Sequence, residues 1–181
     1  MTRHRFPPNA LRLGAVAILL LVPQLGVAAD IVGRVVSIAD GDTLTVLDAQ
    51  NQQHRIRIAG IDAPEKAQPF GQKSKASLSM MAFNRDVEIF GNKLDRDGRT
   101  IAKVMVADPT CNMPTCPKIH DAGLLQIRAG LAWWDRQYAR EQTPKDREDY
   151  EVAEFQAKIH RLGLWGDKNP VPPWEWRHGG Q

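Results

Sequence analysis

The chain of 181 residues carries 24 Lys and Arg against 21 Asp and Glu, a formal net charge of +3. Residues 1–29 contain three arginines and no acidic residue, so the remainder balances at 21 against 21. This balance excludes a protein that attracts polyanions through its overall field, and such affinity must come from local cations or a bound metal. Roughly 150 residues after this segment are enough for one domain with its own core.

The first 29 residues have the pattern of a secretory signal peptide. Arginines precede an apolar run at 13–22, and small residues follow at 27–29. The run is shorter than the roughly 20 residues of a membrane-spanning helix, and Pro23 interrupts its continuation. We therefore expect a cleaved signal and a secreted or periplasmic protein, with an uncleaved anchor or a lipid-tethered form as the alternatives.

Short β-branched runs broken by turn residues predict strands from Ile31 to Val106. The runs at 31–38 and 43–47 flank an Asp-Gly turn, which is a strong hairpin signal. The third run, 54–61, alternates strictly between polar and apolar residues. Ile56 and Ile58 should face the core, while Arg55 and Arg57 face outward. Two further strands are expected at 87–90 and 100–106.

Helical spacing appears in three segments. Residues 69–83 place Phe70, Ser74, Leu78 and Met81 near one face. A second helix is expected over 119–129, where Gly130 would end it. A third is expected over 145–162, with an apolar stripe that should pack on the core, namely Val152, Phe155, Ile159 and Leu162.

This order of elements favours an α+β fold, in which residues 30–168 form a five-stranded barrel of the OB type with about three α-helices. Residues 169–181 form a tail rich in Pro and Trp, which the prolines should keep extended. The tail either packs back on the domain or stays mobile. Cys111 and Cys116 are the only cysteines, and in an exported protein a disulfide is favoured over a metal site.

Two acidic clusters twenty residues apart, at 40–43 and 62–65, are the clearest chemical signal in the chain. Carboxylates in such turns offer hard oxygen ligands to Ca²⁺. Arg57 and Arg99 suit phosphate, because a guanidinium binds two phosphate oxygens at once. The combination predicts a metal-assisted phosphodiesterase site, although each residue taken alone is better explained as part of a turn, a strand end or a helix cap.

The run from Asp40 to Thr43, the segment Arg57–Glu65, the Asp97-Gly98-Arg99 turn and the segment Gly130–Trp133 together resemble the staphylococcal nuclease family. The likeness extends to Trp165, and its most specific part is Asp-x-Pro-Glu with an arginine five residues before the Asp. The family's five-stranded OB-type barrel with three helices agrees with the element order predicted above.

The resemblance implies a role for each matching residue. Asp42, Asp62 and the main-chain carbonyl of Ala63 would bind Ca²⁺, although the family more often has Thr at the position of Ala63. Asp40 would act near the metal through water, or would simply form the turn. Glu65 would serve as general base or water positioner, while Arg57 and Arg99 would bind the phosphate and stabilise the transition state.

Two positions depart from the family pattern. Asp97 stands where the nuclease that gives the family its name has a tyrosine near the terminal phosphate. An anionic side chain facing a phosphate would repel it, so either Asp97 points away or the substrate binds differently at this position. Residues 133–138 fall where the family has tyrosines beside the base. Tyr138 and one tryptophan suit stacking on a nucleobase, whereas Asp135 is unusual there.

The sequence therefore predicts a Ca²⁺-dependent, monomeric nuclease acting on DNA and RNA. The resemblance implies 3′-phosphate and 5′-hydroxyl products and a preference for single strands. One alternative is a catalytically inactive OB-fold module that binds nucleic acid or protein. Another is an envelope protein that uses the Pro and Trp tail for contact.

Overall fold

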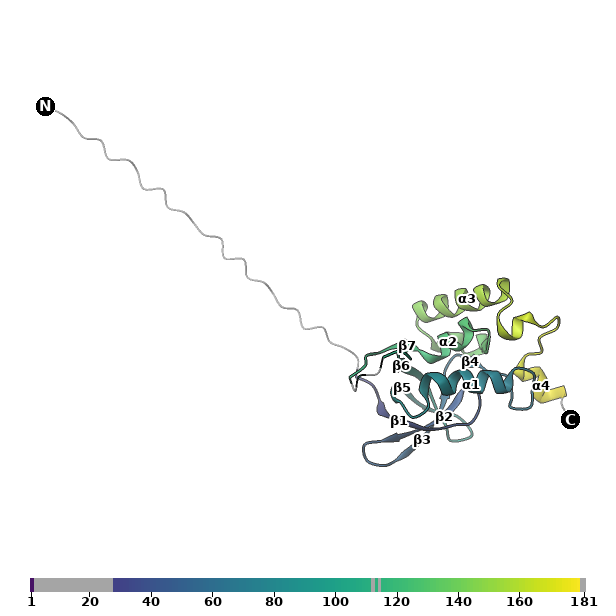
Figure 1. Cartoon of the computed structure of the whole chain (residues 1–181), viewed down its shortest axis with the longest axis horizontal. Coiled ribbons are helices and arrows are strands. Elements are labelled where there is room, and N and C mark those ends of the chain that lie inside the picture. Colours follow the sequence, from purple (N-terminus) through teal and green to yellow (C-terminus); the bar gives the residue numbers. More distant parts are fainter. Residues whose placement is uncertain (2–27, 112, 114, 180–181) are drawn as a thin grey trace.

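The computed structural model describes residues 1, 28–111, 113 and 115–179. The predicted signal peptide lies almost entirely outside the described residues. Within the part of the chain that is described, no helix combines the length and apolar character needed to cross a bilayer. Figure 1 shows that the strands and helices from β1 to α4 are gathered into one folded body.

Most of the strands form one curved sheet, in the order β3-β2-β1-β5-β6-β7. Its neighbouring strands are antiparallel, and a parallel pairing of β3 with β6 closes five of them into a barrel. The predicted five-stranded OB-type barrel is thus confirmed. The strands of this sheet are β1 (Ile31–Ile38), β2 (Thr43–Asp48), β3 (Gln53–Ile58), β5 (Asp86–Leu94), β6 (Thr100–Ala107) and β7 (Lys118–Asp121).

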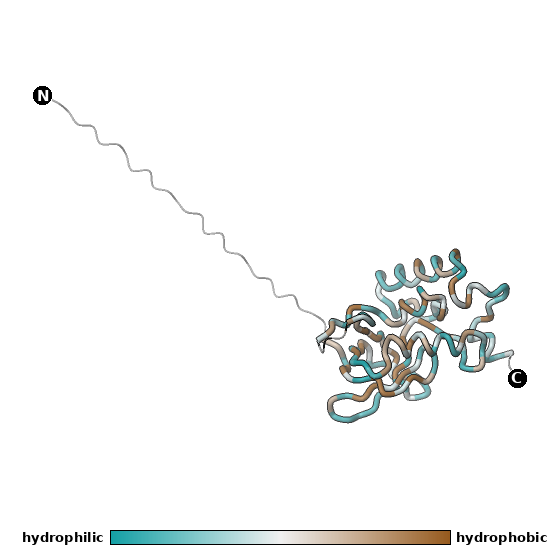
Figure 2. Tube along the Cα trace, in the orientation of Figure 1, coloured by the Kyte–Doolittle hydropathy of each residue, from teal (hydrophilic) through white to brown (hydrophobic). Residues whose placement is uncertain are grey.

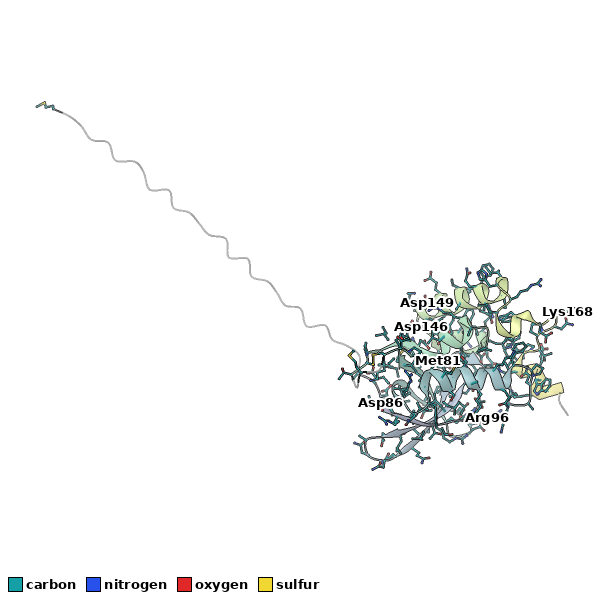
Figure 3. The ribbon with its side chains drawn as sticks, viewed as in Figure 1. Met81, Asp86, Arg96, Asp146, Asp149 and Lys168 are labelled. Carbon is teal, nitrogen blue, oxygen red and sulfur yellow. A yellow bond between two sulfur atoms is a disulfide. The ribbon has the colours of Figure 1, made fainter. Side chains whose placement is uncertain are left out.

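A second, two-stranded sheet pairs β4 (Ile61–Asp62) with β8 (Trp133–Trp134). The helices are α1 (Gly71–Ala82), α2 (Ala122–Arg128), α3 (Pro144–Ile159) and α4 (Pro173–Gly179), with 3-10 turns η1 (Arg136–Glu141) and η2 (Gly163–Gly166). Helix α2 contacts both α1 and α3, and Figure 1 shows α2 between them. Figure 3 labels Met81 on α1 and Asp146 and Asp149 on α3.

The inward faces of the barrel strands make the core. Val35, Val46, Ile56, Ile89 and Val104 are fully buried, and Figure 2 shows apolar segments gathered in the strands. The alternation predicted for the third strand is confirmed, because Ile56 and Ile58 are buried while the arginine between them is turned away from the core.

Two predicted helices differ from the structure. Helix α2 begins at Ala122 and not at Ile119, because residues 118–121 pair with β6 as an extra strand. The predicted apolar stripe of α3 is wrong, since all four of its residues are exposed: Val152, Phe155, Ile159 and Leu162. The buried face instead carries Tyr150, Ala153, Glu154 and Ala157. Small alanines allow α3 to lie close to α2, and this close approach decides which face is covered.

The tail was expected to be extended, but from Pro173 onward it forms α4. It packs back on the domain beside the loop that follows β4. Pro173 is buried, and Gln68 Nε2 donates a 2.6 Å hydrogen bond to the carbonyl of Val171. The ring of Trp174 lies edge-on to Trp133, with centroids 5.7 Å apart. The predicted disulfide between Cys111 and Cys116 is present.

Candidate active site

The turn between β1 and β2 holds the first acidic cluster. Asp42 N donates to Asp40 Oδ1 at 3.0 Å, so the turn is closed on itself. Gln126, buried on α2, donates through Nε2 to the carbonyl of Gly41 at 2.7 Å. Thr43 Oγ1 donates to Asp42 Oδ1 at 2.8 Å. Thr43 therefore fixes the Asp42 carboxylate, while Gln126 of α2 fixes the main chain of the turn beside it.

The second acidic cluster, residues 62–65, lies beside Asp42 because the chain changes direction sharply after β3. Gly60 adopts a positive φ of 74°, which glycine allows at no steric cost, and the chain then forms β4. Pairing of Asp62 with Trp133 in β8 fixes this short strand. Ala63 N donates to Asp42 Oδ2 at 2.9 Å, which joins the two clusters directly. Asp42 and Asp62 are only 4% and 2% exposed.

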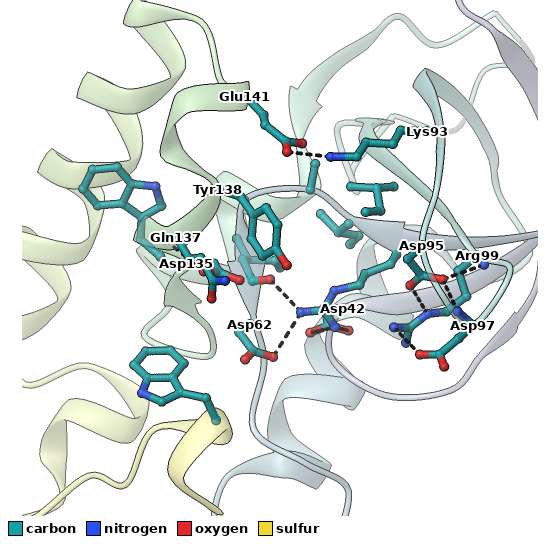
Figure 4. A pocket seen from close by; sticks show the side chains of 18 of the residues that line it. Asp42, Asp62, Lys93, Asp95, Asp97, Arg99, Asp135, Gln137, Tyr138 and Glu141 are labelled. Atoms are coloured by element: carbon teal, nitrogen blue, oxygen red, sulfur yellow. Dashed lines mark hydrogen bonds and ion pairs between the residues drawn. The ribbon is translucent and has the colours of Figure 1, made fainter. Parts of the chain in front are cut away.

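Arg57 lies between the two buried carboxylates. Its Nη1 is 3.4 Å from Asp42 Oδ1, and its Nη2 is 3.2 Å from Asp62 Oδ1. Figure 4 labels Asp42 and Asp62, which lie close together in the cavity. Strand β3 directs the side chain there, because the alternation that buries Ile56 and Ile58 turns Arg57 to the opposite face.

Burial, together with the nearby charges of Asp40 and Asp62, raises the pKa of Asp42 to about 7. The charge of Arg57 and the hydrogen bond from Ala63 N act in the opposite direction. Burial also raises the pKa of Asp135, with Asp62 as the next cause. These carboxylates thus lie where negative charge is poorly solvated and where one more cation would stabilise the ionised forms.

Glu65 lies at the rim of the same group, and its side chain bonds to a residue that sequence reasoning did not identify. Arg177 of α4 donates from Nη1 to Glu65 Oε1 at 2.6 Å. The same guanidinium donates from Nη2 to Asp62 Oδ2 at 2.6 Å and from Nη1 to Asp62 Oδ1 at 3.2 Å. No motif in the sequence pointed to Arg177, because its proximity depends on how the tail packs.

Arg99 faces the same cavity but stands apart from the carboxylate pair. Its Nε donates to Asp95 Oδ2 at 2.7 Å and its Nη2 donates to Asp97 Oδ2 at 3.2 Å. Figure 4 shows this separate ion-pair cluster in the turn after β5. Asp97, the position that departs from the family pattern, is therefore paired with Arg99.

A cavity of about 840 Å³ joins these groups. It lies between the barrel mouth, the β5–β6 turn, η1 and α4, and its wall includes Asp42, Arg57, Asp62, Glu65, Arg99, Tyr138, Trp174 and Arg177. Tyr138 is 42% exposed, whereas Arg136 lies over the Trp134 ring at 4.4 Å. Tyr138 is thus the residue of η1 whose aromatic ring is free to stack on a nucleobase.

The donor set suits a hard cation. Among the described residues no group of three His, Cys, Asp or Glu side chains is arranged to hold a metal ion. Asp42 and Asp62 nevertheless offer two buried carboxylates, and among the hydrogen bonds of described residues none ends on the Ala63 carbonyl beside them. Carboxylate and carbonyl oxygens, completed by water, are ligands that Ca²⁺ and Mg²⁺ both accept.

An OB-type barrel with carboxylates and arginines converging at its mouth defines a hydrolase that acts on phosphodiester bonds. The family model described as staphylococcal nuclease homologue matches residues 55–167. The chain belongs to this staphylococcal nuclease family, whose members are generally metal-dependent.

Similar proteins carry names of the same kind. A micrococcal nuclease from Shigella flexneri is 38% identical over 168 residues, which are 93% of this chain and 92% of that protein. An uncharacterized endonuclease from Haemophilus influenzae is 38% identical over 80% of this chain and 71% of its own length. A probable staphylococcal-like nuclease from rice is 30% identical over 80% of this chain and 32% of its own. The chain is thus an enzyme of the endonuclease type.

Proposed function

We propose that the protein is a Ca²⁺-dependent nuclease that hydrolyses DNA and RNA and leaves 3′-phosphate and 5′-hydroxyl ends. The observation that carries this proposal is the joined group of Asp42, Arg57 and Asp62, with Glu65 at its rim. Simple binding of nucleic acid would not need buried carboxylates, because they oppose the approach of phosphate.

In this proposal Asp42, Asp62 and the carbonyl of Ala63 hold the cation. When bound, the cation polarises the phosphate and offsets its negative charge. Arg57, already fixed between the carboxylates, donates to one phosphate oxygen, and Arg99, which lines the same cavity, donates to another. Both contacts strengthen as the pentacoordinate transition state gains charge, so they lower the barrier selectively.

Glu65 supplies the base in the same scheme. Its carboxylate is 38% exposed and lines the cavity, so a water molecule can reach it. It accepts a proton from that water as the oxygen bonds to phosphorus and the bond from phosphorus to the 5′ oxygen breaks. The leaving 5′ oxygen takes a proton from solvent water and becomes the 5′-hydroxyl. A site that contacts phosphates and offers Tyr138 for stacking fits single strands with little sequence preference.

Cleavage of single-stranded DNA and RNA by the purified protein tests the assignment. We expect degradation with Ca²⁺, none after chelation, and a loss of about 10²–10³ in rate for Glu65→Ala or Arg99→Ala. Arg34→Gln is the matched control, because Arg34 pairs with Asp86 away from the cavity. Binding without cleavage in the wild type would instead assign an inactive OB-fold module. Cleavage that survives chelation or both substitutions would contradict the proposed site.

We further propose that the protein is exported after removal of residues 1–29 and acts as a monomer. The arginine-flanked apolar run and the small residues that follow it support export. A mature chain that begins at Asp30, measured by mass spectrometry of protein from the producing cell, is the expected result. Light scattering of the same sample should give the mass of one chain.

A further inference from the structure

Helix α4 is attached to the domain next to the catalytic groups. Gln68, four residues after Pro64 in the loop that also carries Glu65, bonds to the carbonyl of Val171 just before α4. Trp174 packs on Trp133. Trp133 in turn pairs with Asp62 in the small sheet. The position of α4 is thereby coupled to the position of a proposed metal ligand.

From this helix Arg177 reaches two carboxylates with different proposed roles. One guanidinium nitrogen bonds to Asp62 Oδ2 and the other to both Asp62 Oδ1 and Glu65 Oε1, at 2.6 to 3.2 Å. Among the described residues, Arg177 is the only one that hydrogen-bonds to the Glu65 side chain. The main-chain N–H of Glu65 is held separately by Gln68 Oε1 at 3.0 Å. The backbone of Glu65 is therefore fixed without Arg177, whereas the direction of its carboxylate is not.

A contribution to stability accounts poorly for the bond to Glu65. The Arg177 side chain is 44% exposed and that of Glu65 is 38% exposed, and an ion pair with such exposure contributes little. The bonds to Asp62, whose side chain is only 3% exposed, hold the guanidinium without it. The planar guanidinium of an arginine can bond to two carboxylates at once and fix their relative orientation. The single ammonium group of a lysine does this less well. The geometry therefore suits alignment of two groups more than attachment of the tail.

We propose that Arg177 is a positioning residue of the nuclease, which aligns the Glu65 carboxylate relative to Asp62 for attack on the phosphate. The proposal rests on the role given to Glu65 above. It makes α4 part of the active site, and it assigns the segment before α4, through Val171, and Trp174 within α4 to holding this arginine in place.

Steady-state kinetics of Arg177→Gln, Arg177→Lys and the control Arg34→Gln test the proposal. We expect Arg177→Gln to lower kcat by about 10- to 100-fold, as loss of partners that orient catalytic groups commonly does. KM should change by less than about threefold, because the substrate contacts are retained. Arg177→Lys should recover part of kcat, and Arg34→Gln should match the wild type. Unchanged kcat in Arg177→Gln, or a loss confined to KM, would overturn the proposal.

A double-mutant cycle tests whether Arg177 acts through Glu65. In a Glu65→Gln background, adding Arg177→Gln should lower the residual rate by less than about threefold, because residues that act as one unit are not additive. A full additional loss would show that Arg177 acts independently and would overturn the proposal. This comparison also separates a specific role from a general loss of structure, which would lower the rate in either background.

Two measurements do not depend on turnover. Calorimetric titration with Ca²⁺ should give Arg177→Gln an affinity equal to or tighter than that of the wild type, because a cation beside Asp62 has been removed. Weaker Ca²⁺ binding that accounts for the lost rate would overturn the proposal. Crystal structures should show the Glu65 carboxylate displaced in Arg177→Gln, and an unmoved carboxylate would contradict it. If the wild type itself fails to cleave with Ca²⁺, the proposed function fails instead, and the structures still decide whether Arg177 orients Glu65.

Discussion

At the scale of single residues, Gly41 decides how closely the acidic turn approaches its neighbours. A Cβ at this position would lie 1.8 Å from Ser74 Oγ and 2.8 Å from the Cβ of Ala63. Ser74 is fully buried on α1, so it has no free space to move into. Glycine therefore allows α1, the turn and Ala63 to meet, and this contact places Asp42 beside Asp62.

We expect Gly41→Ala to push the turn away from Ala63. The free energy of unfolding should fall by about 1–3 kcal/mol, as is typical when a packed site is overfilled. The nuclease rate should fall about 100-fold, because catalytic groups tolerate little displacement. Denaturant unfolding and initial rates check both values. Gly179→Ala, which has no atom within 4 Å of the added Cβ, is the control. Full activity of Gly41→Ala would show that the turn accepts the shift.

At the scale of elements, α3 supports the site through one buried acid. Glu154 Oε1 accepts a hydrogen bond from the main-chain N–H of Trp134 at 3.1 Å. Its other oxygen pairs with Arg136 and Lys158, both at 2.8 Å. Because β8 pairs with β4, this contact connects α3 to the strand that carries Asp62.

The same acid predicts a dependence of stability on pH. Burial acts to raise the pKa of Glu154, but hydrogen bonds from Lys158 and Arg136 outweigh it and lower the pKa below the usual 4.5. Because the pKa of Glu154 is lower in the folded protein than in the unfolded chain, its ionised form stabilises the fold at pH values above the unfolded-chain pKa. This stabilisation is lost as the pH falls through the pKa of the folded protein. Glu154→Gln should therefore cost about 1–3 kcal/mol at neutral pH and less at an acid pH below the usual 4.5.

Urea unfolding of wild type and Glu154→Gln at both pH values measures this difference. Glu148→Gln is the control, because Glu148 is an exposed acid on the same helix. If Glu154→Gln lowers the free energy of unfolding equally at both pH values, the charge of Glu154 does not stabilise its contact with β8.

At the scale of the whole molecule, three separate parts of the chain meet at one cavity: the barrel, the η1 segment and α4. A ligand held by Asp42 and Asp62 contacts only the folded state, because in the unfolded chain these residues are far apart. Cation binding should therefore stabilise the entire domain.

We expect Ca²⁺ at 100 times its dissociation constant to add about 2.7 kcal/mol to the free energy of unfolding. Removal of Ca²⁺ by a chelator should reverse the gain. Asp62→Asn should lose most of the effect, whereas Asp86→Asn, a surface control in the Arg34 ion pair, should keep it. Thermal melting with and without Ca²⁺ gives the answer, and equal stabilisation of both variants would place the cation elsewhere.

Local patterns predicted the parts of the fold that depend on neighbours in sequence. Strict alternation placed Ile56 and Ile58 inside and Arg57 outside, because successive side chains of a strand point to opposite faces. The same kind of pattern misjudged α3. Its large apolar residues resemble a core face, but which face a helix buries depends on the fit to its partner, and here small alanines provide it.

The sequence by itself determined the chemical character of the site, because the carboxylates, the arginines and the spacing between them are properties of the sequence. Their pattern resembles that of one family. It also determined the barrel, whose strands follow from short-range alternation and turns. Only the tertiary structure decided that Asp97 pairs with Arg99 and that α4 brings Arg177 to Glu65. The reason is physical: Arg177 and Glu65 are 112 positions apart, and only packing of the tail on the domain brings them together.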